Sequence, residues 1–286
     1  MVKAESTPVP VPADGDRPRF HSLPPEVPQP ARRWWGRHVR ELRWQAELAR
    51  LLVDPIYRAV GVPPGDGSHI LLIPGFLASD ESLAVLARWL KRVGYQPRRA
   101  GIRVNVDCAD RVLGRLEERL ELIHHQSGRS VGIIGHSRGG HFAKALATRR
   151  QELVRHVISM GAGLDTPFDI SVPTKAAVAA VRVAHGRRSD DARRMGCMTA
   201  GCTCGFMRDY KAPFADSVPL TSIYSRGDGV VWWEACTVDY ARCVEVTGSH
   251  VGLAFNRQAY RVIAETLAET RWKSPRHART SRRQTA

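Results

Sequence analysis

The sequence predicts an α/β fold, in which a doubly wound, mostly parallel sheet carries helices on both faces. Short apolar runs alternate with amphipathic stretches along the body of the chain. Several of these runs end in glycine-containing turns, and the polar residues that could carry chemistry follow them. Alternation of this kind specifies a parallel sheet, and ligands of such sheets bind beyond the carboxyl ends of the strands. With 286 residues, the chain is long enough for one such domain and an inserted cap.

Two segments are expected to precede the sheet. Residues 1–30 are rich in proline and lack an apolar signal-peptide core, which predicts a flexible leader. In residues 31–60, arginines mix with apolar residues spaced mostly three or four apart, which predicts a basic amphipathic helix, and a turn-rich linker follows up to residue 64. Such a helix either lies on anionic lipid or packs its apolar stripe on the rest of the protein, and packing is the simpler interpretation.

The body, residues 65–270, is expected to alternate strands and helices. A buried apolar run at 68–77 predicts the first strand and its turn. The pattern then predicts a helix at 81–93, a strand at 96–104, a helix at 109–126, and a strand through 157–160.

The most informative motif is Gly-His-Ser-Arg-Gly at 135–139, a G-x-S-x-G pentapeptide. It lies between a strand-like run at 130–134 and a helix-like stretch at 141–150. A sharp turn from strand to helix strains the central residue, and small residues two positions away let the chain segments pass closely. Ser137 is therefore predicted to sit on a nucleophile elbow and to present its hydroxyl alone.

Two later turns complete the pattern. The strand-like run 219–225 leads into Arg-Gly-Asp-Gly, which places Asp228 on a strand-end turn, and a short strand at 243–246 leads into a turn that ends in His250. The order Ser, Asp, His is that of α/β-hydrolases and differs from the chymotrypsin and subtilisin orders. Asp165 is an alternative acid, because it follows the strand after the nucleophile helix.

Through these motifs and Ile-Pro-Gly-Phe at 73–76, the chain resembles the α/β-hydrolase superfamily, and within it the bacterial lipases and esterases, over roughly residues 65–270. The resemblance implies a serine hydrolase that cleaves carboxylic esters through an acyl-enzyme, with Ser137, Asp228 and His250 as the catalytic triad. It requires no metal and no organic cofactor. A thioesterase or an acyltransferase would use the same triad, and a non-catalytic binding member of the fold is a further alternative.

The resemblance also implies an oxyanion hole formed by the backbone N–H groups of Phe76 and Arg138, with Leu77 as the alternative first donor. Many members carry His before the glycine of this loop, whereas this chain has Pro74. Arg138 also departs from the small or apolar residue often found after the nucleophile. Its side chain could hold an acidic group of the substrate, but pairing with a carboxylate of the lid is the favoured interpretation.

An insertion at about 164–218 precedes the strand that leads to Asp228. Its apolar stretch 176–184 predicts a cap helix, which would exclude water and form an apolar wall for an acyl chain. The alternative is an insertion that packs on the domain and has no gating role. The cysteines could form a disulfide within the lid or from it to Cys236, bind a metal, or stay reduced. They are Cys108, Cys197, Cys202, Cys204, Cys236 and Cys243.

The net charge of +15 lies largely near the two ends. Residues 31–60 hold seven arginines against three acids, and the tail 271–286 holds six cations without an acid, which predicts a disordered tail. No nucleic-acid motif accompanies this charge, so nucleic acid is not an expected partner. The expected partners are a small-molecule or lipid ester substrate and, through residues 31–60, an anionic membrane surface. Without an apolar run of about 18 residues, the expected location is the cytoplasm, free or peripheral to the membrane.

Overall fold

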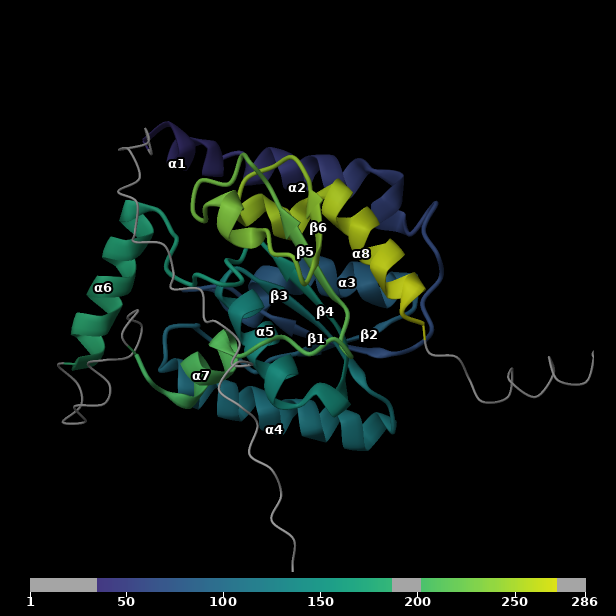
Figure 1. The fold of residues 1–286 in the computed structure, drawn as a ribbon. Helices are drawn as coiled ribbons and strands as arrows, with labels where there is room; N and C mark the ends of the chain where they lie inside the picture. The colour runs from purple at the N-terminus through teal and green to yellow at the C-terminus, as the bar shows by residue number, and fades with distance from the viewer. Residues whose placement is uncertain (1–34, 187–201, 272–286) are drawn as a thin grey trace, which may run out of the picture. The chain divides into compact units, whose positions relative to one another are not determined.

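The computed structural model describes residues 35–186 and 202–271 (Figure 1). The predicted leader 1–30, the tail from residue 272 and the segment 187–201 of the insertion lie outside the described residues. Within them, no helix is both long and apolar enough to cross a bilayer.

Six strands form one sheet in the order β2-β1-β3-β4-β5-β6, and every pair of neighbours is parallel. The strands are β1 His69–Ile73, β2 Gln96–Arg99, β3 Val131–His136, β4 Val154–Met160, β5 Leu220–Tyr224 and β6 Arg242–Glu245. The inner strands are largely buried, whereas β2 and β6 at the edges are partly exposed. The predicted fold class is confirmed.

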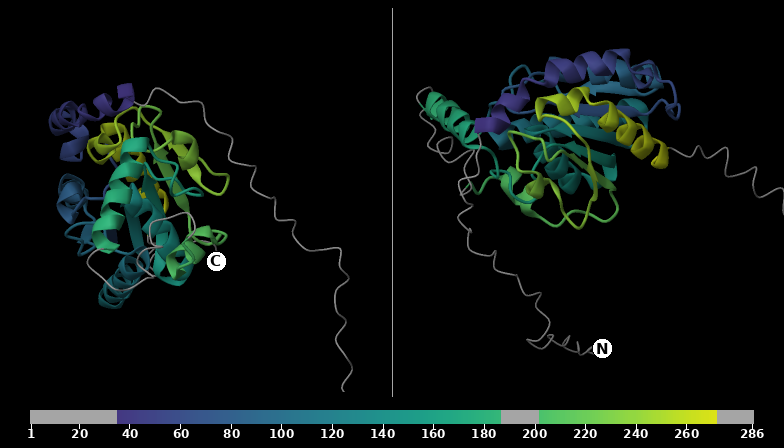
Figure 2. Two further views of the ribbon diagram at one scale, coloured as in Figure 1. Left: turned by 90° about the vertical axis from the view of Figure 1, so that its left-hand side faces the viewer. Right: turned by 90° about the horizontal axis from the view of Figure 1, so that it is seen from above.

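Helices cover both faces of this sheet (Figures 1 and 2). The main ones are α3 Ala84–Val93, α4 Ala109–Ser127, α5 Arg138–Arg149 and α8 Arg257–Glu269. In β1, Leu71 and Ile73 pack into the core that holds α4 and α5, while Ile70 and Leu72 pack into the core that holds α3 and α8. Successive strand residues point to opposite faces, so one short apolar strand supplies both cores.

The N-terminal segment forms two helices, so the prediction of one helix over 31–60 is wrong for its described part. These are α1 Trp35–Glu41 and α2 Trp44–Val53, and a 3-10 helix Pro55–Arg58 follows. The Asp54 carboxylate accepts from the backbone N–H of Ile56 at 3.0 Å and caps that 3-10 helix. Pro55 lacks an N–H, so α2 ends before it.

The insertion forms α6 Val172–Gly186 and α7 Gly205–Lys211. The predicted cap helix 176–184 thus lies within a longer helix. α7 packs on α5, where the rings of Phe206 and Phe142 lie 5.2 Å apart between centroids. An isolated antiparallel bridge between Ile170 and Val231 ties the start of the insertion to the chain that follows β5.

Candidate active site

Ser137 joins β3 to α5 in a strained backbone conformation, with φ 53° and ψ −126°. A Cβ atom on Gly135 would lie 2.3 Å from the carbonyl oxygen of Gly139, and one on Gly139 would lie 2.1 Å from that of Ile73. Both positions therefore exclude any side chain. The turn has the geometry that the G-x-S-x-G motif predicts, and it costs strain of the kind that concentrates at functional sites.

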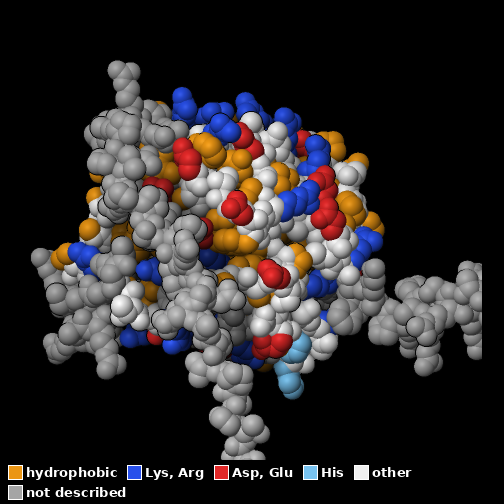
Figure 3. All heavy atoms as spheres, in the orientation of Figure 1, with side chains coloured by type: hydrophobic (Ala, Val, Ile, Leu, Met, Phe, Trp, Pro, Cys, Tyr) orange, Lys and Arg blue, Asp and Glu red, His pale blue; other side chains and the backbone are white. Residues whose placement is uncertain are grey.

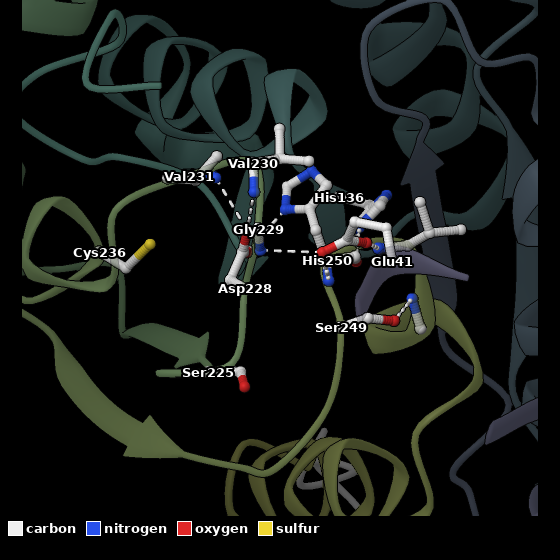
Figure 4. Close-up of polar contacts among 12 residues, drawn as sticks. Glu41, His136, Ser225, Asp228, Gly229, Val230, Val231, Cys236, Ser249 and His250 are labelled. Carbon is white, nitrogen blue, oxygen red and sulfur yellow. Dashed lines mark hydrogen bonds and ion pairs between the residues drawn. The ribbon is translucent and has the colours of Figure 1, made fainter. Parts of the chain in front are cut away.

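The turns after β5 and β6 bring Asp228 and His250 together (Figure 4). The Oδ2 atom of Asp228 lies 2.7 Å from Nδ1 of His250, and both side chains are buried. The other carboxylate oxygen, Oδ1, accepts from the backbone N–H groups of Val230 and Val231, each at 2.8 Å. Burial alone would lower the pKa of His250, but the charge and hydrogen bond of Asp228 outweigh it and raise that pKa above its ordinary value.

His136 supports the imidazole of His250 from the side. The two ring centroids lie 5.0 Å apart, and Nε2 of His136 lies 2.9 Å from the backbone oxygen of His250. A carbonyl only accepts hydrogen bonds, so His136 carries its proton on Nε2. Burial and the neighbouring His250 lower the pKa of His136 to about 4, so the ring is neutral near pH 7. No sequence pattern indicated a role for His136 beyond its place in the pentapeptide.

Ser137 lies at the same edge of the sheet, since β3, β5 and β6 are parallel and all three residues follow their carboxyl ends. Gly161 follows β4 beside them: a Cβ there would lie 3.2 Å from both Asp228 Oδ2 and His250 Nδ1. In the described part of the chain, no hydrogen bond joins Ser137 to His250. Bonds of this type often tighten only in the complex with substrate.

The loop after β1 distinguishes the two candidates for the first oxyanion donor, Phe76 and Leu77. The Leu77 N–H donates to the backbone oxygen of Asn105 at 3.3 Å, whereas the Phe76 N–H makes no hydrogen bond to any described residue. Asn105 is fully buried and also donates from Nδ2 to the Pro74 oxygen at 2.8 Å. It thus fixes both sides of Phe76, a role that no sequence pattern indicated.

The Arg138 side chain is held by the loop that follows β2. Its guanidinium donates to the Asn105 backbone oxygen at 3.0 Å, to Asn105 Oδ1 at 3.1 Å and to the Asp107 backbone oxygen at 2.8 Å. It also lies over the ring of Phe142, 5.1 Å from the centroid. The backbone N–H of Arg138 belongs to the first turn of α5, where amide groups point out of the helix end. Residues 187–201 of the insertion lie outside the described residues, so the pairing of Arg138 with a carboxylate of the lid stays a prediction.

A partly open pocket lies beside Ser137, and its empty space, which includes open solvent at the mouth, measures about 720 Å³. Phe76 lines it from the loop after β1, Val178 from α6, Met207 from α7 and Val231 from the chain after Asp228. Most of its lining residues are apolar, as expected for a site that accepts a hydrocarbon group.

The remaining sequence candidates lie elsewhere. Asp165, the alternative acid, contacts Nζ of the buried Lys144 at 3.4 Å and the Tyr240 hydroxyl at 2.5 Å rather than His250. All five described cysteines are free thiols, so no disulfide joins the described part of the insertion to Cys236, and Cys197 lies outside the described residues. Among residues 35–186 and 202–271, no cluster of three His, Cys, Asp or Glu side chains could hold a metal ion.

No protein-family model and no curated protein sequence matches the chain. Solved structures do resemble it. A monoglyceride lipase of Saccharomyces cerevisiae aligns with a TM-score of 0.53 and 14% identity, over 74% of this chain and 91% of the lipase. The mature lipase BlEst2 of Bacillus licheniformis aligns with a TM-score of 0.52 and 16% identity, over 73% of this chain and 95% of the lipase. A monoacylglycerol lipase of Paleococcus ferrophilus aligns with a TM-score of 0.51 and 12% identity, over 73% of this chain and 97% of the lipase. The chain therefore has the α/β-hydrolase fold and resembles lipases and esterases of that fold.

Proposed function

We propose that the chain is a serine hydrolase that cleaves carboxylic esters through an acyl-enzyme. One observation carries the proposal: a buried Asp228–His250 pair with a 2.7 Å hydrogen bond lies at the sheet edge where Ser137 occupies a strained elbow. The residue types, chain order and tautomer-fixing hydrogen bond are those of a triad. The lipases of similar fold add support at the level of the fold alone.

In the proposed reaction, Nε2 of His250 takes the Ser137 proton as the hydroxyl oxygen attacks the ester carbonyl. Asp228 holds the Nδ1–H and stabilises the imidazolium that forms. The N–H groups of Phe76 and Arg138 bind the oxyanion of the tetrahedral intermediate. His250 then protonates the leaving alcohol, and water, activated by the same imidazole, releases the acid and restores Ser137.

The pocket supports esters with an acyl chain, as small molecules or as lipids. Its apolar lining can bury a hydrocarbon chain next to Ser137, with α6 as a cap over part of it. A thioester substrate, or an alcohol in place of water as acyl acceptor, would use the same groups. Product analysis with added alcohols separates hydrolysis from transfer.

Hydrolysis of p-nitrophenyl esters from acetate to palmitate tests the proposal. The wild type should hydrolyse part of the series, and Ser137→Ala should lose at least 10³-fold in kcat while keeping its thermal midpoint, by analogy with the large losses on removing a nucleophilic serine (~10⁶-fold). Equal background rates for both proteins, with thioesters as well as esters, would contradict the enzymatic function and favour a binding role.

We also propose that α1 and α2 contact an anionic membrane surface through their outer face. The large apolar residues exposed on these helices and on the turn between them are Val39, Leu42, Leu52 and Val53, and the exposed cations are Arg40, Arg43 and Arg50. Lys and Arg side chains gather along the upper edge in Figure 3, where α1 and α2 lie in Figure 1. Apolar side chains among arginines suit a lipid interface. Vesicles with anionic lipid should sediment the protein, and Leu42→Ser with Val53→Ser should weaken this; equal sedimentation with neutral vesicles would contradict the charge dependence.

A further inference from the structure

The turn that carries His250 is bonded to glutamates from the N-terminal helices, about two hundred residues earlier in the chain. Glu41, the last residue of α1, accepts from the backbone N–H of His250 at 2.9 Å and of Val251 at 3.0 Å. The same carboxylate accepts from the N–H of Gly229, the residue after Asp228, at 2.8 Å (Figure 4). One side chain therefore bridges the turn of the acid and the turn of the histidine.

Glu47 of α2 fixes the preceding residue of the same turn. It is buried, and it accepts from the backbone N–H of Ser249 at 3.0 Å and from its hydroxyl at 2.7 Å. A Cβ on Gly252 would lie 1.4 Å from Oε2 of Glu47, so only glycine leaves room for this carboxylate. The Gly252 N–H donates to Ser249 Oγ at 3.1 Å. Every N–H from Ser249 to Gly252 is thus bonded, and three of the four donate to these two glutamates.

The stability of α1 does not explain Glu41. A carboxylate at the C-terminal end of a helix is disfavoured by the helix dipole. Here it instead faces the N-terminal end of the 3-10 helix Val251–Phe255, whose first N–H groups have no acceptor within that helix. Charge-assisted hydrogen bonds of this kind are among the stronger ones. Leu51 of α2 is fully buried in the core, so the helices that present the glutamates are themselves anchored.

We propose that Glu41 is a positioning residue of the triad, which holds the Asp228 and His250 turns at a fixed separation, and that Glu47 locks the His250 turn from the other side. This inference rests on the proposed function. Loss of the bridge lets the two turns move apart, so the hydrogen bond between Asp228 and His250 weakens and Ser137 loses an aligned base. Glu41 itself touches neither the substrate nor the reacting atoms.

The rate at which a fluorophosphonate labels Ser137 tests this role without a known natural substrate. In that reaction the Ser137 oxygen bonds to phosphorus, fluoride leaves, and His250 takes the serine proton. Glu41→Ala should lower the second-order labelling rate at least tenfold. Glu41→Gln should fall between, because its amide oxygen can still accept from Gly229 and His250. The downfield proton resonance of the His250 Nδ1–H should move or broaden in Glu41→Ala.

Two control variants separate positioning from stability. Gln45→Ala, exposed on α2, should label at the wild-type rate. Leu120→Ala, fully buried on α4 and in the other core, should lower the thermal midpoint more than Glu41→Ala does, while its folded molecules label at the wild-type rate with an unchanged Nδ1–H resonance. If Glu41→Ala were labelled at the wild-type rate, the inference would be overturned. The same would follow if the labelling rate of every variant fell only in proportion to its loss of folded protein. A wild type labelled no faster than Ser137→Ala would overturn the proposed function and this inference with it.

Discussion

Among single residues, Gly161 shows how closely the backbone passes the proposed catalytic pair, Asp228 and His250. Its φ is 59°, and a Cβ there would approach Asp228 and His250 to 3.2 Å each. Gly128 has a similar φ of 64°, but a Cβ there would meet nothing within 4 Å. We predict that Gly128→Ala loses about 1 kcal/mol of stability from the left-handed backbone, and that Gly161→Ala loses more, because its Cβ would also lie 2.8 Å from Leu253 Cδ1. Only Gly161→Ala should also lose activity, by at least tenfold in kcat/KM; equal activity of the two variants would contradict the placement of the pair.

In the proposed mechanism, the raised pKa of His250 should set the acid limb of the pH profile. The neutral imidazole is the proposed base, so kcat/KM should fall as the pH drops through the His250 pKa, which lies above 6.5. His136 does not titrate there, because its pKa is lowered to about 4. A pH series on one soluble ester should therefore show a single deprotonation above pH 6.5. An acid limb centred near pH 4 would show instead that His250 is not the base.

Asp228→Asn tests the tautomer. The amide oxygen would have to replace Oδ1, which accepts from Val230 and Val231, so the NH₂ group would face Nδ1 of His250. The imidazole would then carry its proton on Nε2, where it cannot accept from Ser137. We predict a loss of kcat of about 10⁴-fold, as is typical of this change in a triad, with little change in the thermal midpoint. Activity close to the wild type would point to a different acid.

These residues differ in how far the sequence could predict them. Ser137, Asp228 and His250 follow strands with local signatures, so their places could be predicted without knowing any contact. Asn105 and Glu41 have no such signature, because each acts through partners far along the chain. Glu41 lies 209 residues before His250 and 188 before Gly229. Only the folded sheet edge brings these groups together.

At the scale of elements, the pattern of α1 and α2 predicted an amphipathic segment but not its orientation. Acidic residues in such a pattern are counted on the solvated side. Glu47 instead faces inward and is buried, whereas Leu42 and Val53 are 68% and 71% exposed. The hydrogen bonds to the catalytic turns outweigh the preference of these charges for water. The periodicity of a sequence indicates which residues share one face of a helix. It does not indicate which of the faces packs against the rest of the protein.

The position of α6 beside the pocket leads to a prediction about chain length. Val178 lines the pocket, whereas its neighbour Ala179 is exposed. Val178→Phe should reduce the room for a long acyl chain and lower kcat/KM for palmitate esters tenfold or more, while acetate esters are hydrolysed at nearly the wild-type rate. A change of this size corresponds to about 1–3 kcal/mol of lost apolar contact. Ala179→Phe, on the same helix, should leave the chain-length profile unchanged; identical profiles for both variants would place the acyl chain elsewhere.

At the scale of the whole molecule, the sheet order and the two apolar cores follow from the alternation that the sequence displays, and the comparison with solved structures supports the same fold. The residues at which individual strands end are harder to predict. The strand expected over 96–104 ends at Arg99, because the following residues leave the sheet and Asn105 bonds to the oxyanion loop. A prediction from the local pattern continues a strand until the pattern itself is interrupted. Here a tertiary contact ends the strand earlier.

The burial of three neutral histidines should make the whole fold sensitive to acid. Burial is the largest cause that lowers the pKa of His136 to about 4 and the pKa values of His141 and His156 to about 3 each. The unfolded chain binds protons at these positions below about pH 6.5, whereas the folded protein does not until its lowered pKa values are reached. The stability is therefore fully present above pH 6.5 and falls as the pH drops from there towards 4. His250 does not oppose this change, because its raised pKa places its own effect above that range.

The slope of the free energy of unfolding against pH can be measured by urea unfolding between pH 7 and pH 5. Three protons taken up on unfolding correspond to a loss of at most about 4 kcal/mol per pH unit, since each proton contributes about 1.4 kcal/mol per unit. His156→Asn removes one of these groups away from the catalytic turns, so its slope should be about one third shallower. Gln126→Asn, exposed on α4, removes no titratable group and should keep the wild-type slope. If the His156 variant kept the full slope, the acid sensitivity would have to come from carboxylates rather than from the buried imidazoles.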